Sequence, residues 1–533
     1  MLADGGPLAA FGRLRRGGAS TDVVTLLAGY ATQAYGAVVS LAFAPAILRA
    51  VGPEAYGLVG VFLIVQAWFQ LIDAGMTPAL TRETARFAGG VVDASSLART
   101  VRGMELIVGL AAIPLFLFAA SLSERVATTW LDTDALSVEQ VATAFQLMAV
   151  ILVIRWFSGV RRGVLVGFER HARLHAVTFT VATLRYPCIL LWFAVVDATP
   201  YNYFAFQLFI SVCEALVLWA GSRRDLPARE HTPMVASIRS LRSIAAFATT
   251  HGLLAIAWIA IIQTDKLLLT RHLSLAHFGY FTLAAAAAAG VNLIVLPLAQ
   301  MLKPRLTKLY ALGEEARMQA TYRLATRVAM VSLAGLTATF LFFGHEVMLA
   351  WTGDPDVAMV GGPVLAYYTL GNLAMALGSF AYYIQYAHGD LRLHVWGTLI
   401  KLVAIVPTIY FAVTAYGFRG TAIAWAAFWT LHVLTWIAYT HRTFLPGQHL
   451  SWLVRDIGRP LLPALLAGAT LSRTLTLPED RAGAALALVA MAGGLTLLAA
   501  TFSDLRGSSR SLADRPRVGP TAGVGRQPTG KTP

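Results

Sequence analysis

The sequence predicts an all-α polytopic membrane protein of about 14 transmembrane helices. Three observations predict this fold class. Of the 533 residues, 57% are hydrophobic and only 13% are charged, whereas a soluble domain carries about 25% charged residues. Apolar runs of about 20 residues, each long enough to cross a bilayer, alternate with short basic segments. The first half of the chain also repeats in the second half, at an offset of 222 positions.

The apolar runs define the helices in order. A helix rises about 1.5 Å per residue, so that about 20 residues span the hydrocarbon core. The first run is too long for the core of a signal peptide, and we expect it to remain as a helix of the mature protein. The predicted helices cover residues 23–48, 55–80, 103–121, 138–160, 174–196, 201–220, 243–270, 275–302, 324–344, 358–386, 393–413, 419–440, 452–472 and 482–503.

The internal repeat relates two groups of six helices. The offset of 222 places Arg49 on Arg271 and Gly57 on Gly279, and it places the first four predicted helices on the seventh to the tenth. An offset of 219 then aligns the fifth helix with the eleventh. Because six is even, both groups enter the membrane from the same side. The repeats are therefore parallel, and an axis along the membrane normal relates them.

The repeat divides the chain into six parts. The two parts with six helices are the N-lobe and the C-lobe, and a basic linker joins them. The last residues are rich in Gly, Ser, Pro and Arg and nearly lack apolar residues, so we expect a disordered tail. The parts are a cytoplasmic N-terminal tail (1–22), the N-lobe (23–220), a basic cytoplasmic linker (221–242), the C-lobe (243–440), two extra helices (441–503) and a cytoplasmic tail (504–533).

The positions of the basic residues predict the orientation. With the N-terminus in the cytoplasm, cytoplasmic segments hold 31 of the 42 Lys and Arg residues, and outside segments hold 6. Cytoplasmic loops of membrane proteins carry such an excess of positive charge. We therefore expect both termini in the cytoplasm. The same distribution argues that the net charge of +14 does not serve nucleic-acid binding, since the charge is spread over loops rather than gathered in one patch.

The sequence contains no motif of a soluble catalytic site. Cys188 and Cys213 lie in apolar segments, where we interpret them as reduced packing residues, with no disulfide or metal framework. No HExxH, Walker A or GxSxG motif occurs in a usable context. We therefore expect no cofactor and no enzymatic activity, and we look for the functional site inside the membrane.

Charged residues deep in the membrane are the best candidates for that site. A charge near the bilayer centre costs about 2.5–3.5 kcal/mol on insertion scales, so it normally faces a cavity or a partner. Arg185 and Lys401 lie deep in repeat-related helices, and we expect both to line a cavity. Arg49 and Arg271 end repeat-related helices at the outer face, where they serve either loop solvation or a ligand.

Two acidic residues add a possible coupling function. Asp265 and Lys266 are adjacent in one predicted helix. Adjacent helical residues point about 100° apart, so the two side chains cannot form a tight pair and also face the same direction. We expect Lys266 to face the substrate, unless it extends to the membrane surface with Asp265 as its local partner. Glu214 either forms a structural ion pair with Arg155 or serves as a carboxylate that binds and releases a proton.

Two further charges near the cytoplasmic face are easier to explain. Asp73 lies just before Gly75 and Pro78, which break the helix, and we interpret it as structural. Arg327 is close enough to the end of its helix to extend its charge into water.

The chain resembles the polysaccharide (O-antigen type) flippases of the multidrug/oligosaccharidyl-lipid/polysaccharide (MOP) exporter superfamily. The resemblance covers about residues 23–440 and rests on three stretches. These are GPEAYGLVGVFLIVQAWFQLIDAGMTPALTRETAR at 52–86, RRGVLVGFERHARLH at 161–175, and TDKLLLTRHLSLAHFGYFTLA at 264–284. The alanine run 284–289 departs from any fixed pattern of that family.

The resemblance implies a V-shaped transporter whose two lobes enclose a cationic cavity and alternate in access. Such a protein flips undecaprenyl-pyrophosphate-linked oligosaccharide across the bacterial plasma membrane for O-antigen, capsule or exopolysaccharide export. No ATPase motif is present, so either a gradient of H⁺ or Na⁺ as the coupling ion or the downstream removal of substrate must supply direction. Membrane lipid, a polysaccharide polymerase and chain-length machinery would be partners. The expected site residues are Arg49, Arg185, Lys266, Arg271 and Lys401 for the substrate and Asp265 and Glu214 for ion coupling.

Two other functions stay open at this point. A cation-coupled multidrug exporter of the same superfamily would need an acidic, aromatic cavity, whereas the deep charges here are mostly basic. A membrane polysaccharide polymerase or ligase would share the hydropathy but would need a long outside loop.

Overall fold

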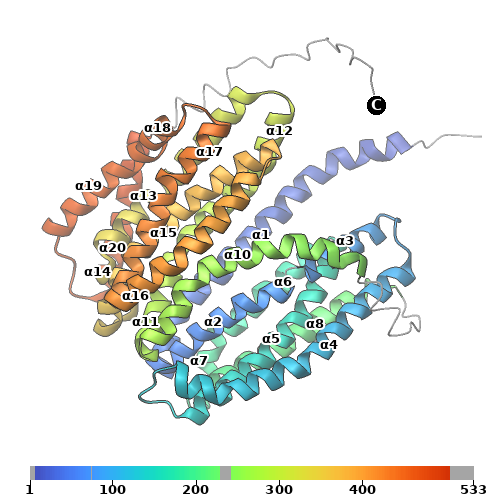
Figure 1. Ribbon diagram of the computed structural model, residues 1–533, viewed down its shortest axis with the longest axis horizontal. Coiled ribbons are helices and arrows are strands. Elements are labelled where there is room, and N and C mark those ends of the chain that lie inside the picture. Colours follow the sequence, from blue (N-terminus) through green and yellow to red (C-terminus); the bar gives the residue numbers. More distant parts are fainter. Residues whose placement is uncertain (1–6, 74, 228–241, 504–533) are drawn as a thin grey trace, which may run out of the picture.

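The computed structural model describes the fold of residues 7–73, 75–227 and 242–503, with side chains from residue 28 onward except at 72 and 242–253. Over these residues the chain forms helices and contains no β-strand, which confirms the all-α prediction. The helices gather in two bundles (Figure 1). α1 to α8 form the N-lobe, α10 to α17 form the C-lobe, and α18 to α20 pack beside the C-lobe.

The helices of the N-lobe begin at strong capping residues. Asp93 accepts a hydrogen bond from the backbone N–H of Ser96 at the start of α4, and Ser137 and Gln140 form a capping box at the start of α5. The elements are α1 (Pro7–Val51), α2 (Pro53–Asp73), α3 (Met76–Ala88), α4 (Ala94–Arg125), the π-helix η1 (Val126–Trp130), α5 (Val138–Gly167), α6 (His171–Arg185), α7 (Pro187–Phe193) and α8 (Pro200–Arg223).

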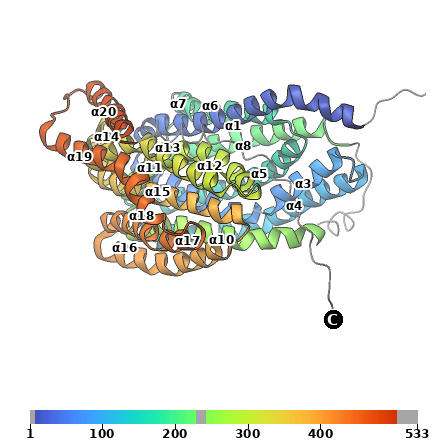
Figure 2. The same ribbon diagram turned by 90° about the horizontal axis from the view of Figure 1, so that it is seen from above.

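The C-lobe and the helices that follow it continue the pattern. The elements are α10 (Arg242–His272), α11 (Leu275–Ala288), α12 (Gly290–Ala311), α13 (Glu315–Phe342), α14 (Gly344–Thr352), α15 (Pro355–His388), α16 (Arg392–Leu434), α17 (Trp436–Phe444), α18 (His449–Ser451), the π-helix η2 (Trp452–Gly458), α19 (Arg459–Thr474) and α20 (Arg481–Phe502). α19 and α20 lie at the opposite end of the molecule from α3 and α4 (Figure 1 and Figure 2).

Eleven helical stretches of the described chain are long and apolar enough to cross a membrane. One of them, Arg392–Phe444, is 53 residues long, and Gly417 divides it with non-helical φ and ψ of 58° and −143°. The Nζ atom of Lys401 lies 5.3 Å from the centroid of the Trp429 ring, although 28 residues of straight helix would separate them by about 42 Å. The stretch is therefore a helical hairpin with two crossings. With α10 and α19, all fourteen predicted helices coincide with helices of the structure.

Two predicted helices differ in their extent. α1 begins at Pro7 and thus extends into the predicted tail, because Ala, Leu and Arg favour helix and continue it beyond the apolar run. The predicted helix 55–80 is two helices, since α2 ends at Asp73 and α3 begins at Met76. Pro78 is tolerated in the first turn of α3, where its missing N–H costs nothing. The domain boundaries stay predictions, and most of the linker (228–241) and the final tail lie outside the described residues.

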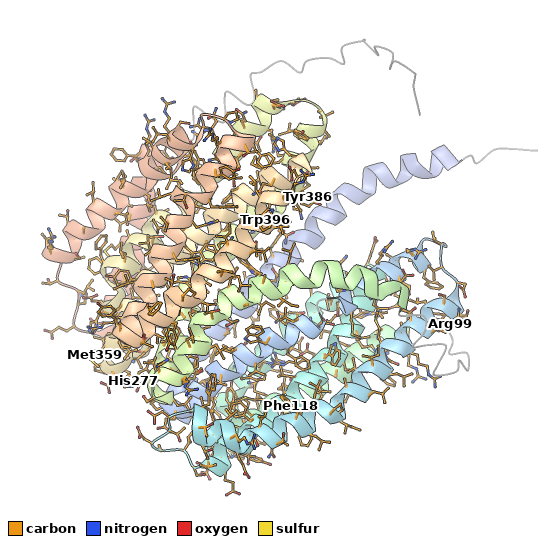
Figure 3. The ribbon with its side chains drawn as sticks, viewed as in Figure 1. Arg99, Phe118, His277, Met359, Tyr386 and Trp396 are labelled. Atoms are coloured by element: carbon orange, nitrogen blue, oxygen red, sulfur yellow. The ribbon has the colours of Figure 1, made fainter. Side chains whose placement is uncertain are left out.

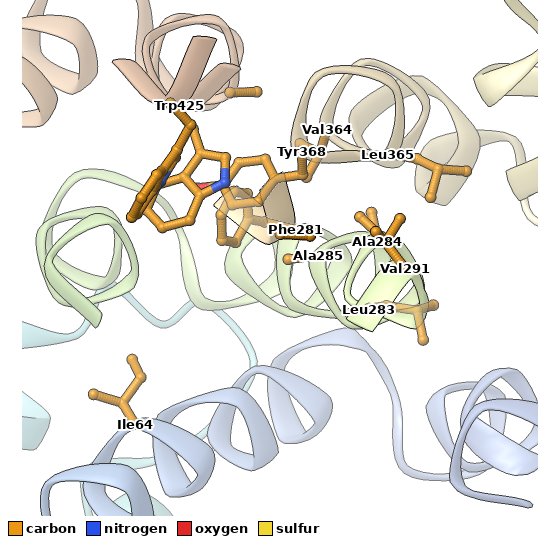
Figure 4. Close-up of a cluster of buried hydrophobic side chains, with 14 of the residues drawn as sticks. Ile64, Phe281, Leu283, Ala284, Ala285, Val291, Val364, Leu365, Tyr368 and Trp425 are labelled. Atoms are coloured by element: carbon orange, nitrogen blue, oxygen red, sulfur yellow. The ribbon is translucent and has the colours of Figure 1, made fainter. Parts of the chain in front are cut away.

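The two lobes meet where α2 packs against α11. Small residues allow this contact, since a Cβ on Gly57 would lie 2.2 Å from the carbonyl oxygen of Leu275. Ala284 and Ala285 of the alanine run are buried beside Phe281 and Tyr368 in the core (Figure 4). Away from this contact the ribbons of the lobes diverge, toward the end that carries α3 and the start of α1 (Figure 1).

The helices after the C-lobe are attached to α13 by buried ion pairs. Asp456 is fully buried, and its carboxylate forms ion pairs with Nε of Arg323 at 2.6 Å and with Nε of Arg327 at 3.1 Å. The prediction that Arg327 extends into water was therefore incomplete, because an acidic partner from η2 holds its guanidinium. α19 and α20 both pack on α13, away from the contact between α2 and α11.

Candidate functional site

A group of basic side chains lies inside the N-lobe. We call Arg155, Arg162, Arg185 and Glu214 the N-lobe cluster. Arg155 and Arg162 are seven residues apart on α5 and so project from the same face of the helix. The carboxylate of Glu214, on α8, is 6% exposed and pairs with Arg162 and, at 3.0 Å, with Nη2 of Arg185. Three positive charges thus surround one negative charge.

Arg155 is held separately from the other two arginines. Its Nη1 donates to Oε1 of Gln66, and its Nε lies 3.5 Å from Oγ of Ser211. The guanidinium also stacks 5.0 Å from the centroid of Phe62. The expected ion pair between Arg155 and Glu214 was therefore assigned to the wrong arginine. Arg162 was missed because it reads as a loop residue, although its spacing from Arg155 was a usable signal.

The second candidate site is in the C-lobe, around Asp265. This side chain is fully buried, and its carboxylate accepts hydrogen bonds from Nζ of Lys266 at 3.0 Å and from the hydroxyl of Tyr368 at 2.5 Å. Asp265 is thus the local partner of Lys266, which was one of the two alternatives from the sequence. The flexible lysine side chain folds back along the helix, where Nζ also donates to the carbonyl oxygen of Ile262 at 3.0 Å.

Aromatic rings extend from Asp265 through the C-lobe. We call Tyr368, Trp425, Trp429 and Trp258 the aromatic ladder. Tyr368 stacks on Trp425 with ring centroids 5.5 Å apart (Figure 4), Trp425 meets Trp429 at 5.8 Å, and Trp258 meets Trp429 at 6.1 Å. The sequence did not indicate that these rings come together, because tryptophans of membrane helices are commonly packing or interface residues. The spacing of Trp425, Trp429 and His432, which share one helix face, could have indicated the stripe.

The two deep lysines lie against this ladder. Nζ of Lys266 is 5.6 Å from the centroid of Trp425, and Nζ of Lys401 is 5.8 Å from that of Trp258. Such cation–π contacts stabilise a charge away from water. Lys401 therefore lines a cavity, as predicted, between α10, α15, α16 and α17. The cavity has a volume of about 240 Å³, and its polar and aromatic walls are Trp258, Ser379, Tyr382, Tyr383, Gln385, His394, Thr398, Lys401, Trp429, His432, Trp436 and Thr440.

Arg49 and Arg271 lie elsewhere. Tyr35 of α1 contacts Thr183 of α6 at 2.7 Å, and Arg49 is 14 residues further along α1, about 21 Å away. Arg49 is exposed at the end of α1. Arg271 is exposed at the end of α10, where its guanidinium lies 5.6 Å from the centroid of Trp130. Arg185 therefore lies in the N-lobe cluster, Lys266 and Lys401 lie along the aromatic ladder, and Arg49 and Arg271 lie at helix ends, while their role in substrate binding stays a prediction.

The described residues also bear on metal binding. Over these residues, no group of three or more His, Cys, Asp or Glu side chains is placed to hold a metal ion. Glu214 and Asp265 each have basic partners, so a cation at either carboxylate would compete with an arginine or a lysine.

Comparison with solved structures shows the fold of the chain. It is similar to "Lipid II flippase MurJ, inward closed conformation", with a TM-score of 0.67 at 11% identity over 92% of this chain and 100% of that one. It is also similar to an inward-facing multidrug resistance MATE family transporter of the MOP superfamily, with a TM-score of 0.64 at 14% identity over 77% and 94%. A third similar structure is a MOP superfamily transporter from Pyrococcus furiosus, with a TM-score of 0.51 at 14% identity over 79% of this chain and 94% of that one. The fold is thus that of the MOP transporters.

Comparison of sequences shows the family. Among curated protein sequences, none matches the chain significantly. The family model for polysaccharide biosynthesis proteins matches residues 23–310, which is more than half of the chain and includes the N-lobe cluster and Asp265. The chain is therefore a multi-pass membrane protein that belongs to the polysaccharide biosynthesis protein family.

Proposed function

We propose that the protein flips an undecaprenyl-pyrophosphate-linked oligosaccharide across the bacterial plasma membrane by alternating access, for the export of a surface polysaccharide. The observation that carries the proposal is the N-lobe cluster, in which Arg162 and Arg185 share Glu214 and Arg155 lies beside Gln66, inside a bundle of apolar helices. An excess of positive charge at that depth is costly unless it serves an anion.

Arginines are suited to the proposed ligand. The guanidinium group presents donors in a planar fork that matches phosphate oxygens, and charge-assisted hydrogen bonds of this kind are about twice as strong as neutral ones. Arg162 and Arg185 are partly exposed, at 31% and 16%, whereas Glu214 between them is buried. The arginines thus have donors available for a pyrophosphate while the glutamate keeps them oriented.

Ion coupling is proposed to act through the two buried carboxylates. At Asp265, a bound proton or Na⁺ would weaken the hold on Lys266, which would then become available to the substrate. At Glu214, neutralisation would release Arg162 and Arg185 together. Both steps exchange one partner of an existing ion pair for another, so neither leaves a buried charge alone.

The transport direction follows from the proposed orientation. With both termini in the cytoplasm, the contact between α2 and α11 closes the outer side, and the lobes diverge toward the cytoplasm (Figure 1). Rocking of the lobes about this contact would expose the bound pyrophosphate to the other side. The polyprenyl tail would stay in the bilayer, and polysaccharide polymerase and chain-length machinery would receive the product. The protein would act as a transporter and not as an enzyme.

Reconstitution tests the proposal. Purified protein in liposomes should move a fluorescent lipid-linked oligosaccharide between leaflets, and Arg185→Ala and Arg162→Ala should each reduce the rate at least about tenfold, since a hydrogen bond to a charged group carries that much affinity. Arg99→Ala is the matched control, because Arg99 lies at the start of α4 (Figure 3), outside the N-lobe cluster, where its Nη1 donates to Oγ of Ser95 at 3.0 Å. Normal flipping by both cluster variants would exclude the N-lobe cluster as the site.

A further inference from the structure

The C-lobe cavity beside Lys401 contains polar atoms that no protein group satisfies. Nε1 of Trp429 and Oε1 of Gln385 are buried without a hydrogen-bond partner. Both residues line the cavity, and they are only 1% and 3% exposed. Buried polar groups of proteins are nearly always hydrogen-bonded. An unsatisfied donor and an unsatisfied acceptor on the walls of one cavity therefore indicate a ligand that carries both functions.

The charge of the cavity is positive. Lys401 lines it, and the nearby rings of Trp258 and Trp429 stabilise the ammonium group without neutralising it. No acidic side chain is among the described residues that line the cavity. A ligand with a single negative charge would complete this arrangement.

The remaining walls fit a sugar ring. Trp258, Trp436 and Tyr382 offer aromatic faces, on which the C–H face of a sugar packs while its hydroxyls reach polar groups. The cavity volume of about 240 Å³ is room for at least one sugar ring.

We infer that this cavity binds one carboxylated sugar, of the uronic acid class, within the glycan that the protein carries. The carboxylate lies at Lys401, the hydroxyls satisfy Trp429 and Gln385, and the ring packs on the aromatic walls. This inference rests on the proposed function. The pyrophosphate belongs instead to the N-lobe cluster, because several guanidinium forks hold a multiply charged group better than one lysine does.

A second lysine, Lys303, lies between the cavity and the surface of the C-lobe. Tyr382 lines the cavity, and its ring centroid is 5.9 Å from Nζ of Lys303 on α12. The same Nζ lies 3.9 Å from the ring centroid of Tyr386. Tyr386 is 40% exposed and projects from the edge of the C-lobe (Figure 3). Alternating tyrosines and a lysine thus lead from the cavity to the edge, where the neighbouring sugars of the chain would lie.

Calorimetry with purified full-length protein in nanodiscs tests the inference. The probes are two disaccharides that differ in one group: glucuronate linked to glucose, and glucose linked to glucose. The acidic disaccharide should bind at least about tenfold more tightly, as expected for one charge-assisted hydrogen bond. Lys401→Met should reduce its affinity to that of the neutral one. Lys308→Met, which removes the same charge from the exposed end of α12, should not. Trp258→Leu should reduce the affinity for both disaccharides.

Other outcomes would overturn the inference. Equal affinities for the two sugars, no binding of either, or a preference that survives Lys401→Met would each exclude a carboxylate site at Lys401. The flipping assay with a neutral lipid-linked oligosaccharide separates this failure from failure of the proposed function. Flipping that depends on Arg185 but lacks an acidic-sugar preference overturns only the inference. Binding of the acidic sugar without any flipping overturns the proposed function.

Discussion

Gly57 on α2 and Gly279 on α11 pack against each other's helices in the same way. A Cβ on Gly57 would lie 2.2 Å from the carbonyl oxygen of Leu275, and a Cβ on Gly279 would lie 2.7 Å from that of Pro53. Both glycines and both carbonyl residues are 222 positions apart, so the contact is self-complementary, like the interface of a symmetric dimer. The axis that relates the two repeats therefore passes between these glycines.

Filling this contact should open the outer side. Gly57→Leu forces the helices apart, and overpacking of this kind costs about 1–3 kcal/mol, which corresponds to about a tenfold change in the closed population. We expect a cysteine placed at buried Ala285 to react faster with an impermeant thiol reagent added outside, in a chain whose Cys188 and Cys213 are replaced by Ala. Gly109→Leu is the control, because nothing lies within 4 Å of a Cβ there. An unchanged reaction rate in Gly57→Leu would show that this contact does not hold the lobes together.

The orientation has its own test. A cysteine at Asp354, in the loop before α15, should be labelled from outside by an impermeant reagent. A cysteine at Arg229, in the predicted cytoplasmic linker, should react only after the membrane is permeabilised. The distribution of basic residues is the physical reason. The opposite labelling pattern would reverse both the orientation and the proposed direction of transport.

The sequence was sufficient for the fold because membrane helices leave strong local signals. Apolar length located every predicted helix, and the 222-residue offset aligned Gly57 with Gly279, although it did not predict the contact that the structure shows between their helices. The gap between the predicted helices 393–413 and 419–440 contains Gly417, and Gly75 was interpreted as a helix breaker, but the first gives a hairpin and the second only a short interruption between α2 and α3. Sequence spacing does not determine such angles, because they depend on which neighbouring helix the next segment packs against.

The site was harder to predict because its residues come from several helices. The aromatic ladder joins α10, α15 and α16, and no local pattern links Trp258 with Tyr368. Sequence could not decide whether Asp265 and Lys266 pair, because helix geometry fixes only the Cα–Cβ direction, whereas a lysine has enough rotatable bonds to return to its neighbour. Arg162 was missed because its importance depends on Glu214, which is 52 residues away along the chain.

The glutamate of the N-lobe cluster should control anion affinity. Glu214→Gln removes the negative charge that two arginines share, so we expect inorganic pyrophosphate to bind about tenfold more tightly, as for a gain of one charge-assisted interaction. Thermal stability should fall, because the arginines then repel each other without compensation. Calorimetry and thermal unfolding measure the two effects, with Glu139→Gln, at the exposed start of α5, as the control. Unchanged pyrophosphate affinity in Glu214→Gln would show that Glu214 does not influence the anion-binding site.

Asp265 should control the response to ion gradients. Asp265→Asn removes the charge that holds Lys266, so flipping in liposomes should no longer respond to an imposed proton or sodium gradient. Tyr368→Phe removes only a hydroxyl donor and should keep the response. Asp197→Asn, in the exposed loop before α8, controls for loss of a carboxylate. A gradient response that persists in Asp265→Asn would leave this residue a purely structural ion-pair partner.

The most direct test of the account is flipping of a pyrophosphate-linked glycan by the reconstituted protein. Undecaprenyl-pyrophosphate and undecaprenyl-monophosphate, each carrying the same short oligosaccharide, are compared in liposomes containing the wild-type chain, Arg185→Ala or Arg99→Ala. The account predicts rapid movement of the pyrophosphate lipid by the wild type and by Arg99→Ala. It also predicts much slower movement of the monophosphate lipid, and a loss of at least about tenfold in Arg185→Ala. Equal flipping of both lipids, or flipping by Arg185→Ala at the wild-type rate, would contradict it.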